Sequence, residues 1–187
     1  MDPDLETLVS ECWRLLEEAA ANRGSPLRTP VLASGAAQAR TVVLRAADGG
    51  ARNLAVFTDV RSAKAGQLAA DPRACLVFHD PAAGVQLRAW GDAALHHQDE
   101  VAQAYWGTLH EFAKRPYQSM PGPGIRRGTP GSGIPEIEDG EAGYPNYLVI
   151  LVTVTRLEWL RLEQGGNLSA RFEWDGAGRL SASWIVP

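Results

Sequence analysis

The chain has 187 residues, of which 45% are hydrophobic and 21% are charged. This size and composition suit one domain over residues 1–187 with a substantial core, and they exclude a disordered or fibrous protein. The formal net charge is −4, so the chain has no positive excess of the kind that marks a nucleic-acid or anionic-lipid partner.

Residues 1–24 predict an amphipathic helix. Apolar residues from Leu5 to Ala20 recur at the three- and four-residue spacing of one helical face. Asp2 and Pro3 suit the N-cap and first turn, and Gly24 suits the C-terminal cap. We expect the apolar face to pack on the domain or on a second subunit.

After this helix the hydrophobic pattern changes to a period of two, which indicates strands. Strands are expected over residues 31–34, 39–46, 53–58, 74–79, 85–95, 147–162, 168–175 and 180–186, with helices at 62–70 and 99–112. Residues 116–146 are rich in proline and glycine and predict a long functional or mobile loop. Short connections between strands favour antiparallel pairing, so a closed or partly closed β-barrel with peripheral helices fits better than a Rossmann sheet.

Cellular location and redox chemistry are also constrained. The N-terminus lacks the basic and apolar regions of a signal peptide, and no apolar run is long enough to cross a bilayer, which predicts a cytoplasmic protein that needs no membrane. Cys12 and Cys75 form no CxxC pair and are expected to be buried thiols. The adjacent His96 and His97 diverge on a strand, so no metal site is predicted.

Arg40 and Arg45 lie five residues apart in the expected strand 39–46. On a regular strand that spacing places them on opposite faces, where they would serve different partners. The alternative is a pair of surface arginines on an edge strand.

A second candidate is the sequence from Phe57 to Lys64, where a strand end runs into a helix start. Backbone N–H groups, the Ser62 hydroxyl and the Lys64 ammonium meet there, which is the chemistry that a phosphate group requires. The alternative is a surface helix whose first turn is capped by Ser62 or Asp59.

Gln86 and Arg88 share one face of the strand 85–95, and Trp90 continues that face. A glutamine amide donates and accepts hydrogen bonds, which suits the edge of a flavin or pyrimidine ring, although a lone glutamine on a strand is more often solvent-facing. Arg171 is either a further cation for a buried anion or a surface arginine.

The order of these motifs resembles the pyridoxamine 5′-phosphate oxidase-like, FMN-binding split-barrel family. That family has an Arg-x-(apolar)₃-basic strand, a (Phe/Tyr)-Thr-(Asn/Asp)-x-x-Ser-x-Lys turn and a Gln-x-Arg-x-x-Gly strand. Here they stand in the same order as Arg40 to Arg45, Phe57 to Lys64, and Gln86 to Gly91. The resemblance implies a mainly β fold, a six-stranded antiparallel split barrel with peripheral helices.

The resemblance also implies an FMN cofactor and a homodimer with FMN between the subunits. It assigns the FMN phosphate to Arg40, Ser62 and Lys64, the flavin side to Phe57 and Thr58, the pyrimidine edge to Gln86, and one further FMN contact to Arg171. The family's flavin-contacting tryptophan falls near Leu160, with Trp159 one residue out of register.

The chain departs from the family pattern where vitamin B6 phosphate is held. Asn167 and Ser169 stand in place of an arginine and a histidine, and Leu109 and Ala113 in place of an arginine and a serine. The leading hypothesis is therefore an FMN-dependent oxidoreductase with another small-molecule substrate, contacted by Arg45, Arg88 and the loop that carries Arg126 and Arg127. The alternative is a protein that binds, stores or senses FMN, or binds haem or a deazaflavin, without turnover.

Overall fold

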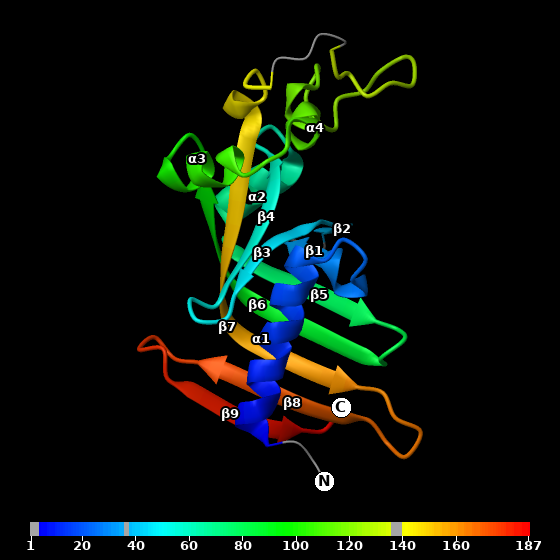
Figure 1. Cartoon of the computed structure of the whole chain (residues 1–187), viewed down its shortest axis with the longest axis vertical. Coiled ribbons are helices and arrows are strands. Elements are labelled where there is room, and N and C mark those ends of the chain that lie inside the picture. The colour runs from blue at the N-terminus through cyan, green and yellow to red at the C-terminus, as the bar shows by residue number, and fades with distance from the viewer. Residues whose placement is uncertain (1–3, 36–37, 136–139) are drawn as a thin grey trace.

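The computed structural model describes residues 4–35, 38–135 and 140–187, and over these residues the chain is mainly antiparallel β-sheet (Figure 1). The strands are β1 (Val31–Ser34), β2 (Gln38–Thr41), β3 (Leu44–Asp48), β4 (Asn53–Asp59), β5 (Arg73–Asp80), β6 (Val85–His96), β7 (Tyr147–Arg161), β8 (Leu168–Trp174) and β9 (Leu180–Ile185). The helices are α1 (Leu5–Ala21), α2 (Ala63–Ala70), α3 (Glu100–Gly107) and α4 (Glu111–Lys114), with 3₁₀ turns η1 (Pro26–Arg28), η2 (Arg115–Gln118) and η3 (Tyr144–Asn146).

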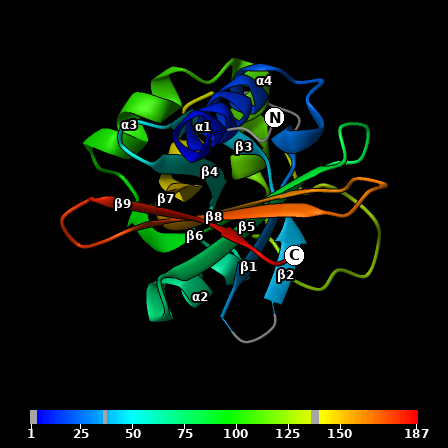
Figure 2. The same cartoon turned by 90° about the horizontal axis from the view of Figure 1, so that it is seen from below.

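The sheet runs in the order β2-β1-β5-β6-β7-β4-β3, and β8 and β9 continue it beside β7. Seen from below, the strands cross one another at steep angles, so the sheet is curled into a half-barrel (Figure 2). The predicted mainly β split-barrel class is confirmed. The predicted strand number is not, because the described residues form nine strands instead of six.

The long strand β7 joins two parts of this sheet (Figure 1). Residues 147–153 pair with β4, whereas residues 156–161 pair with β8, and β6 lies along the other edge of both halves. The register of β6 and β7 shifts between Trp90 and Gly91. A Cβ atom on Gly91 would lie 2.0 Å from the Thr153 carbonyl oxygen, so this close approach of two backbones requires glycine.

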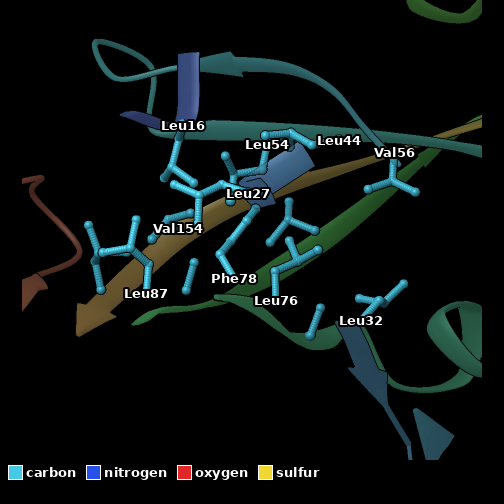
Figure 3. Packing of buried hydrophobic residues seen from close by; sticks show 14 of the residues in the cluster. Leu16, Leu27, Leu32, Leu44, Leu54, Val56, Leu76, Phe78, Leu87 and Val154 are labelled. Atoms are coloured by element: carbon cyan, nitrogen blue, oxygen red, sulfur yellow. The ribbon is translucent and has the colours of Figure 1, made fainter. Parts of the chain in front are cut away.

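The main core lies inside the curled sheet. α1 contributes a buried stripe at helical spacing, made of Leu8, Val9, Cys12, Trp13, Leu16 and Ala19. Leu16 points from α1 toward Leu27 and Leu54 (Figure 3). Each fully buried leucine contributes about 1.5–3 kcal/mol of transfer free energy, which is why the helix packs on the domain as predicted.

The ends of α1 differ from the prediction. Asp4 is the N-cap, and its carboxylate accepts a hydrogen bond from the Thr7 backbone N–H at 3.3 Å. Asn22 is the C-cap in place of Gly24, whose N–H instead donates to the Asn22 side-chain oxygen. The predicted capping residues Asp2 and Pro3 lie outside the described residues.

The expected strand 39–46 is wrong. The chain leaves β2 after Thr41 and begins β3 at Leu44, and β2 pairs with β1 whereas β3 pairs with β4. Val42 and Leu44 are both buried in the core. The alternation of buried and exposed residues therefore continues from β2 into β3, although the two strands pair with different neighbours. The hydrophobic pattern alone does not show where one strand ends and the next begins.

Two further segments differ from the prediction. The expected helix 99–112 ends at Gly107, and a separate turn of helix, α4, begins at Glu111 after His110 accepts the Phe112 backbone N–H. The expected loop 116–146 contains η2 at its start and η3 at its end, and the Asn146 side chain joins them by donating to the Tyr117 carbonyl at 2.7 Å. None of the described helices is long and apolar enough to cross a membrane.

Candidate functional site

Polar groups from β4 and α2 meet where β4 ends. The hydroxyls of Thr58 and Ser62 lie 3.2 Å apart, and the Lys64 Nζ donates to Thr58 Oγ1 at 2.9 Å. Thr58 and Ser62 are buried. Ser62 occupies the N-cap position of α2, but its side chain makes no capping hydrogen bond. Of the two capping residues in the alternative, only Asp59 contacts this turn, since its Oδ1 accepts the Arg61 backbone N–H at 2.8 Å.

Arg40 reaches the same place from β2. Its guanidinium donates to Ser34 Oγ at 2.7 Å and to Gln67 Oε1 of α2 at 2.8 Å. Burial lowers the pKa of Lys64 below its ordinary value, and the positive charge of Arg40 lowers it further. We call Arg40, Thr58, Ser62 and Lys64 the α2 cluster.

Within the described residues, neither cation of the α2 cluster forms an ion pair. The nearby Asp59 carboxylate binds Arg61 instead, with 2.6 Å between Asp59 Oδ2 and Arg61 Nη2. Arg61 also donates to the Ser119 carbonyl at 3.0 Å, which ties the start of the Pro/Gly-rich segment to this turn. Asp59 acts on Lys64 only at a distance, since it raises the pKa of Lys64 without forming an ion pair with it. Two hydroxyls and two cations without an ion-pair partner form a donor set that fits a dianionic phosphate group.

A second charged group lies on β6, β7 and β8. Glu158 is 4% exposed, and its carboxylate contacts the guanidinium of Arg88 and accepts from Arg171 Nε at 2.9 Å. Arg156 Nε lies 4.0 Å from the same carboxylate, and its guanidinium covers the Trp90 ring at 3.9 Å. We call Arg88, Arg156, Glu158 and Arg171 the Glu158 cluster. Sequence reasoning did not single out Glu158, although strand alternation places it on the same face as Arg156.

Gln86 lies one step along the same face as Arg88. It is half-buried and pairs in register with His79 of β5 and Leu160 of β7. Leu160 therefore shares the face of Gln86, whereas Trp159 is buried in the core on the other side. Cys75 also lies on the outer face and is half-buried, so the prediction of a buried thiol is correct for Cys12 only.

The α2 cluster and Gln86 lie on opposite faces of one sheet. Directly paired residues share a face, and Arg40 pairs with Leu32, which pairs with Leu76, which pairs with Ala89. Ala89 faces the core, and Gln86, three residues earlier on β6, faces outward. One chain therefore presents its predicted phosphate contacts and its predicted flavin-edge contact in opposite directions.

Phe57 and Arg45 belong to a third group. The Phe57 ring packs against Tyr105 and Tyr147, with ring centroids 5.2 and 5.3 Å apart, and the Arg45 guanidinium lies 5.8 Å from its centroid. Phe57 thus points away from Thr58, its neighbour on β4. Arg40 and Arg45 do have different partners. The reason is that they lie on two different strands, and not that they lie on opposite faces of one regular strand.

The positions that depart from the family pattern are scattered. Leu109 packs at the edge of the aromatic group around Trp106, and Ala113 lines a cleft beside Arg45. Asn167 accepts the Glu163 N–H, and the buried Ser169 donates to the Trp159 carbonyl. Over the residues that the structure describes, no group of three His, Cys, Asp or Glu side chains could hold a metal ion.

A family profile described as "Pyridoxamine 5′-phosphate oxidase" matches residues 29–129, which is more than half of the chain. Two relatives are both named pyridoxine/pyridoxamine 5′-phosphate oxidase. The protein of Anaeromyxobacter dehalogenans (strain 2CP-C) is 43% identical over 90 residues, which cover 48% of this chain and 41% of the relative. The protein of Thermobifida fusca (strain YX) is 42% identical over 88 residues, which cover 47% of this chain and 36% of the relative. The chain therefore matches less than half the length of either relative.

Two solved structures have the same fold. A pyridoxamine 5′-phosphate oxidase-related, FMN binding protein from Nostoc punctiforme PCC 73102 is 23% identical and has a TM-score of 0.79 over the full length of both chains. PhzG from Burkholderia lata 383, in complex with tetrahydrophenazine-1-carboxylic acid, is 15% identical and has a TM-score of 0.70, covering 99% of this chain and 94% of PhzG. From the profile match and the curled antiparallel sheet, the chain belongs to the pyridoxamine 5′-phosphate oxidase family.

Proposed function

We propose that the protein binds FMN and acts as an FMN-dependent oxidoreductase. The observation that carries this proposal is the α2 cluster, in which Arg40 and Lys64 converge with two buried hydroxyls and have no carboxylate partner within the described residues. Two adjacent cations repel each other, so an anion that binds both is stabilised. The Nostoc punctiforme neighbour is itself described as FMN binding.

In this proposal Arg40, Ser62 and Lys64 hold the phosphate of FMN, and Thr58 orients Lys64. Bound FMN supplies hydride-transfer chemistry, and the protein supplies its position and electrostatic surroundings. The Glu158 carboxylate fixes the guanidinium groups of Arg88 and Arg171 on the outer face beside Gln86. Gln86 then serves the pyrimidine edge of the flavin, Arg171 makes a further FMN contact, and Arg88 is left to contact the substrate.

The proposed site needs two copies of the chain. Because the α2 cluster and Gln86 face opposite ways within one chain, a single flavin contacts both only if a second copy supplies Gln86 and Arg171. We therefore propose a homodimer with FMN between the subunits. If FMN links them, adding FMN suppresses monomer on dilution, and a monomer that keeps full flavin occupancy at nanomolar concentration contradicts the dimeric site.

The proposed substrate is a small molecule other than vitamin B6 phosphate, contacted by Arg45 and Arg88. At the positions that would hold B6 phosphate, Leu109, Ala113 and Asn167 carry no charge. Oxygen-dependent formation of pyridoxal phosphate by the FMN-loaded protein is the assay. Turnover of about 1 per second, an ordinary enzymatic rate, would overturn this assignment.

The phosphate assignment is tested with Lys64→Ala. Removing one charge-assisted contact costs about 1.5–3 kcal/mol, so the Kd for FMN is expected to rise about tenfold or more. Riboflavin lacks the phosphate, and its Kd is expected to stay the same in both proteins. Arg73→Ala is the matched control, because Arg73 follows the other end of α2 and is exposed beside Asp71. An unchanged Kd for FMN in Lys64→Ala would place the phosphate elsewhere.

Catalysis is tested separately from binding. The FMN-loaded protein is mixed anaerobically with NADH or NADPH, and the flavin absorbance is followed before and after air is admitted. Bleaching and reoxidation are expected of an oxidoreductase. The alternative of a binding or storage protein would be favoured if neither NADH nor NADPH reduces the flavin and if no acceptor reoxidises it productively.

A further inference from the structure

The guanidinium of Arg40 is held by two neutral side chains, Ser34 at the end of β1 and Gln67 in the middle of α2. Arg40 Nη1 donates to Ser34 Oγ at 2.7 Å, and Arg40 Nη2 donates to Gln67 Oε1 at 2.8 Å. Ser34 Oγ and Gln67 Oε1 lie 3.2 Å apart. Three elements, β1, β2 and α2, therefore converge on one cation (Figure 2).

The direction of each hydrogen bond in this triangle follows from the groups involved. A guanidinium can only donate, so the Gln67 atom that faces Arg40 is the amide oxygen and not the amide nitrogen. The Ser34 hydroxyl oxygen accepts from Arg40, and its own hydrogen is then directed to Gln67 Oε1. Gln67 therefore accepts from both neighbours, which its two oxygen lone pairs allow.

These contacts are sheltered from solvent. Ser34 is 4% exposed, and Arg40 and Gln67 are half-buried. The Gln67 side chain also lies against the turn after β1, where a Cβ atom on Gly35 would be 3.9 Å from Gln67 Cβ. The direction of the Arg40 guanidinium is thus set by the folded chain, and a ligand that binds it does not have to order it.

Neither partner neutralises Arg40. The amide and the hydroxyl are uncharged, so the positive charge of Arg40 persists and lowers the pKa of Lys64. Arg40 Nε donates no hydrogen bond within the described residues, which leaves part of the planar fork for another acceptor. The guanidinium of Arg88, in contrast, contacts the Glu158 carboxylate. Stability alone would favour a carboxylate at position 67 too, since it has nearly the shape of the amide and bonds more strongly to a guanidinium.

We propose that Gln67 is a positioning residue, which orients Arg40 toward an anion and leaves the charge of Arg40 free to bind it. The inference rests on the proposed function for the identity of that anion, the phosphate group of FMN. It also gives a reason for the uncharged amide, because a carboxylate at position 67 would pair with Arg40 and repel the phosphate group. Position 67 then decides whether the α2 cluster binds an anion or neutralises itself.

The test compares Gln67→Glu with Gln67→Met. Both variants keep the length of the side chain, and only the first adds a charge. Gln67→Glu is expected to raise the Kd for FMN at least tenfold, whereas Gln67→Met loses one hydrogen bond to Arg40 and is expected to raise it about two- to fivefold. The Kd for riboflavin, which lacks the phosphate group, is expected to stay the same in both variants.

Thermal unfolding without FMN separates positioning of Arg40 from support of the fold. Gln67→Glu is expected to unfold at the temperature of the parent or higher, because an ion pair takes the place of a neutral hydrogen bond. The matched control is Gln103→Glu, which adds the same charge at an exposed position on α3 and is expected to bind FMN as the parent does.

Three results would overturn the inference. The first is an equal Kd for FMN in Gln67→Glu and the parent. The second is an equal loss of FMN affinity in Gln67→Glu and Gln67→Met, because the charge would then be irrelevant. The third is a lower unfolding temperature of Gln67→Glu together with weaker riboflavin binding, which would assign Gln67 to the fold.

Inorganic phosphate gives a measurement that does not depend on FMN. Phosphate bound to the α2 cluster raises the unfolding temperature of the parent, and this rise is expected to be smaller in Gln67→Glu. If phosphate acts in this way but the parent does not bind FMN, the proposed function fails and the inference stands. If the parent binds FMN and both variants at position 67 bind it equally well, the inference alone fails. If the parent binds neither FMN nor phosphate, both fail.

Discussion

The α2 cluster and the Glu158 cluster both concentrate positive charge on the sheet, but they balance it differently. In the Glu158 cluster three arginines surround a carboxylate that is 4% exposed. In the α2 cluster Arg40 bonds to Ser34 and Gln67 and Lys64 bonds to Thr58, and neither forms an ion pair within the described residues. The first group is held together by its own charges, whereas the second is the one that we propose binds an anion.

This difference separates positioning from binding. Glu158 contacts Arg88 and Arg171 and so limits the directions in which their guanidinium groups lie on the outer face. Lys64 is half-buried, and both this burial and the nearby charge of Arg40 lower its pKa. The first three of the four predictions below test whether that division is correct.

The largest effect is expected for Glu158→Ala. The variant leaves Arg156, whose Nε is buried and has no hydrogen-bond partner among the described residues, without a counter-charge. The three arginines are each more than a third exposed, so the loss is that of the charged hydrogen bonds to Glu158, about 1.5–3 kcal/mol of unfolding free energy, measured by urea denaturation. Glu163→Ala breaks the exposed pair with Arg161 instead and is expected to cost less than about 1 kcal/mol. Similar losses in both variants would mean that the Glu158 cluster is not self-balanced.

The opposite sign is expected for Lys64→Met in the FMN-free protein. Replacing an unneutralised, half-buried cation by an apolar chain of similar length is expected to raise the unfolding free energy by about 1 kcal/mol near neutral pH. FMN affinity is expected to fall in the same variant. A loss of stability in the absence of FMN would show that Lys64 supports the fold and is not held ready for an anion.

The pH dependence of Lys64→Met sharpens this test. Because the folded pKa of Lys64 lies below 10.5, the unfolded chain binds this proton more tightly than the folded chain. Stability of the parent therefore rises as pH increases from the folded pKa to 10.5. The advantage of Lys64→Met is expected to shrink over that interval, measured as the difference between the two denaturation midpoints.

The smallest effect is expected for Tyr147→Phe, which tests whether every unpartnered polar group marks a ligand. Tyr147 is fully buried, and its hydroxyl has no hydrogen-bond partner in the described part of the chain. Burial raises its pKa, so the hydroxyl stays neutral. Removing the oxygen is expected to stabilise the protein by about 0.5–1 kcal/mol without changing FMN affinity. A weaker Kd for FMN would instead assign that hydroxyl to the site.

The sequence was sufficient where a motif and its local geometry coincide. The turn from Phe57 to Lys64 places Thr58, Ser62 and Lys64 together through one strand end and one helix start, so its spacing alone predicts their proximity. The alternation of β6 likewise puts Gln86 and Arg88 on one face. The short connection between β8 and β9 likewise predicts the antiparallel pairing that these two strands have.

The sequence alone does not predict contacts between segments that are far apart in the chain, or a strand end that lies within a continuously buried stretch. Ser34 and Gln67 hold Arg40 through contacts between β1, β2 and α2, and no local pattern indicates them. The break between β2 and β3 is concealed by the continuous burial of Val42 and Leu44. The Glu158 cluster depends on the pairing of β6, β7 and β8, whose residues are far apart in the chain, and hydrophobic periodicity does not indicate which strands pair.

Gly91 has no side chain, yet its position accepts no other amino acid without a steric clash. Any other amino acid there puts a Cβ atom against the Thr153 carbonyl carbon and oxygen, both backbone atoms that cannot rotate away. In a library of all single substitutions, position 91 is therefore expected to be as intolerant as the buried leucines, although it contributes almost no apolar surface. The glycine of the Gln-x-Arg-x-x-Gly motif therefore has a backbone role here: it lets β6 and β7 approach closely at the point where their register shifts.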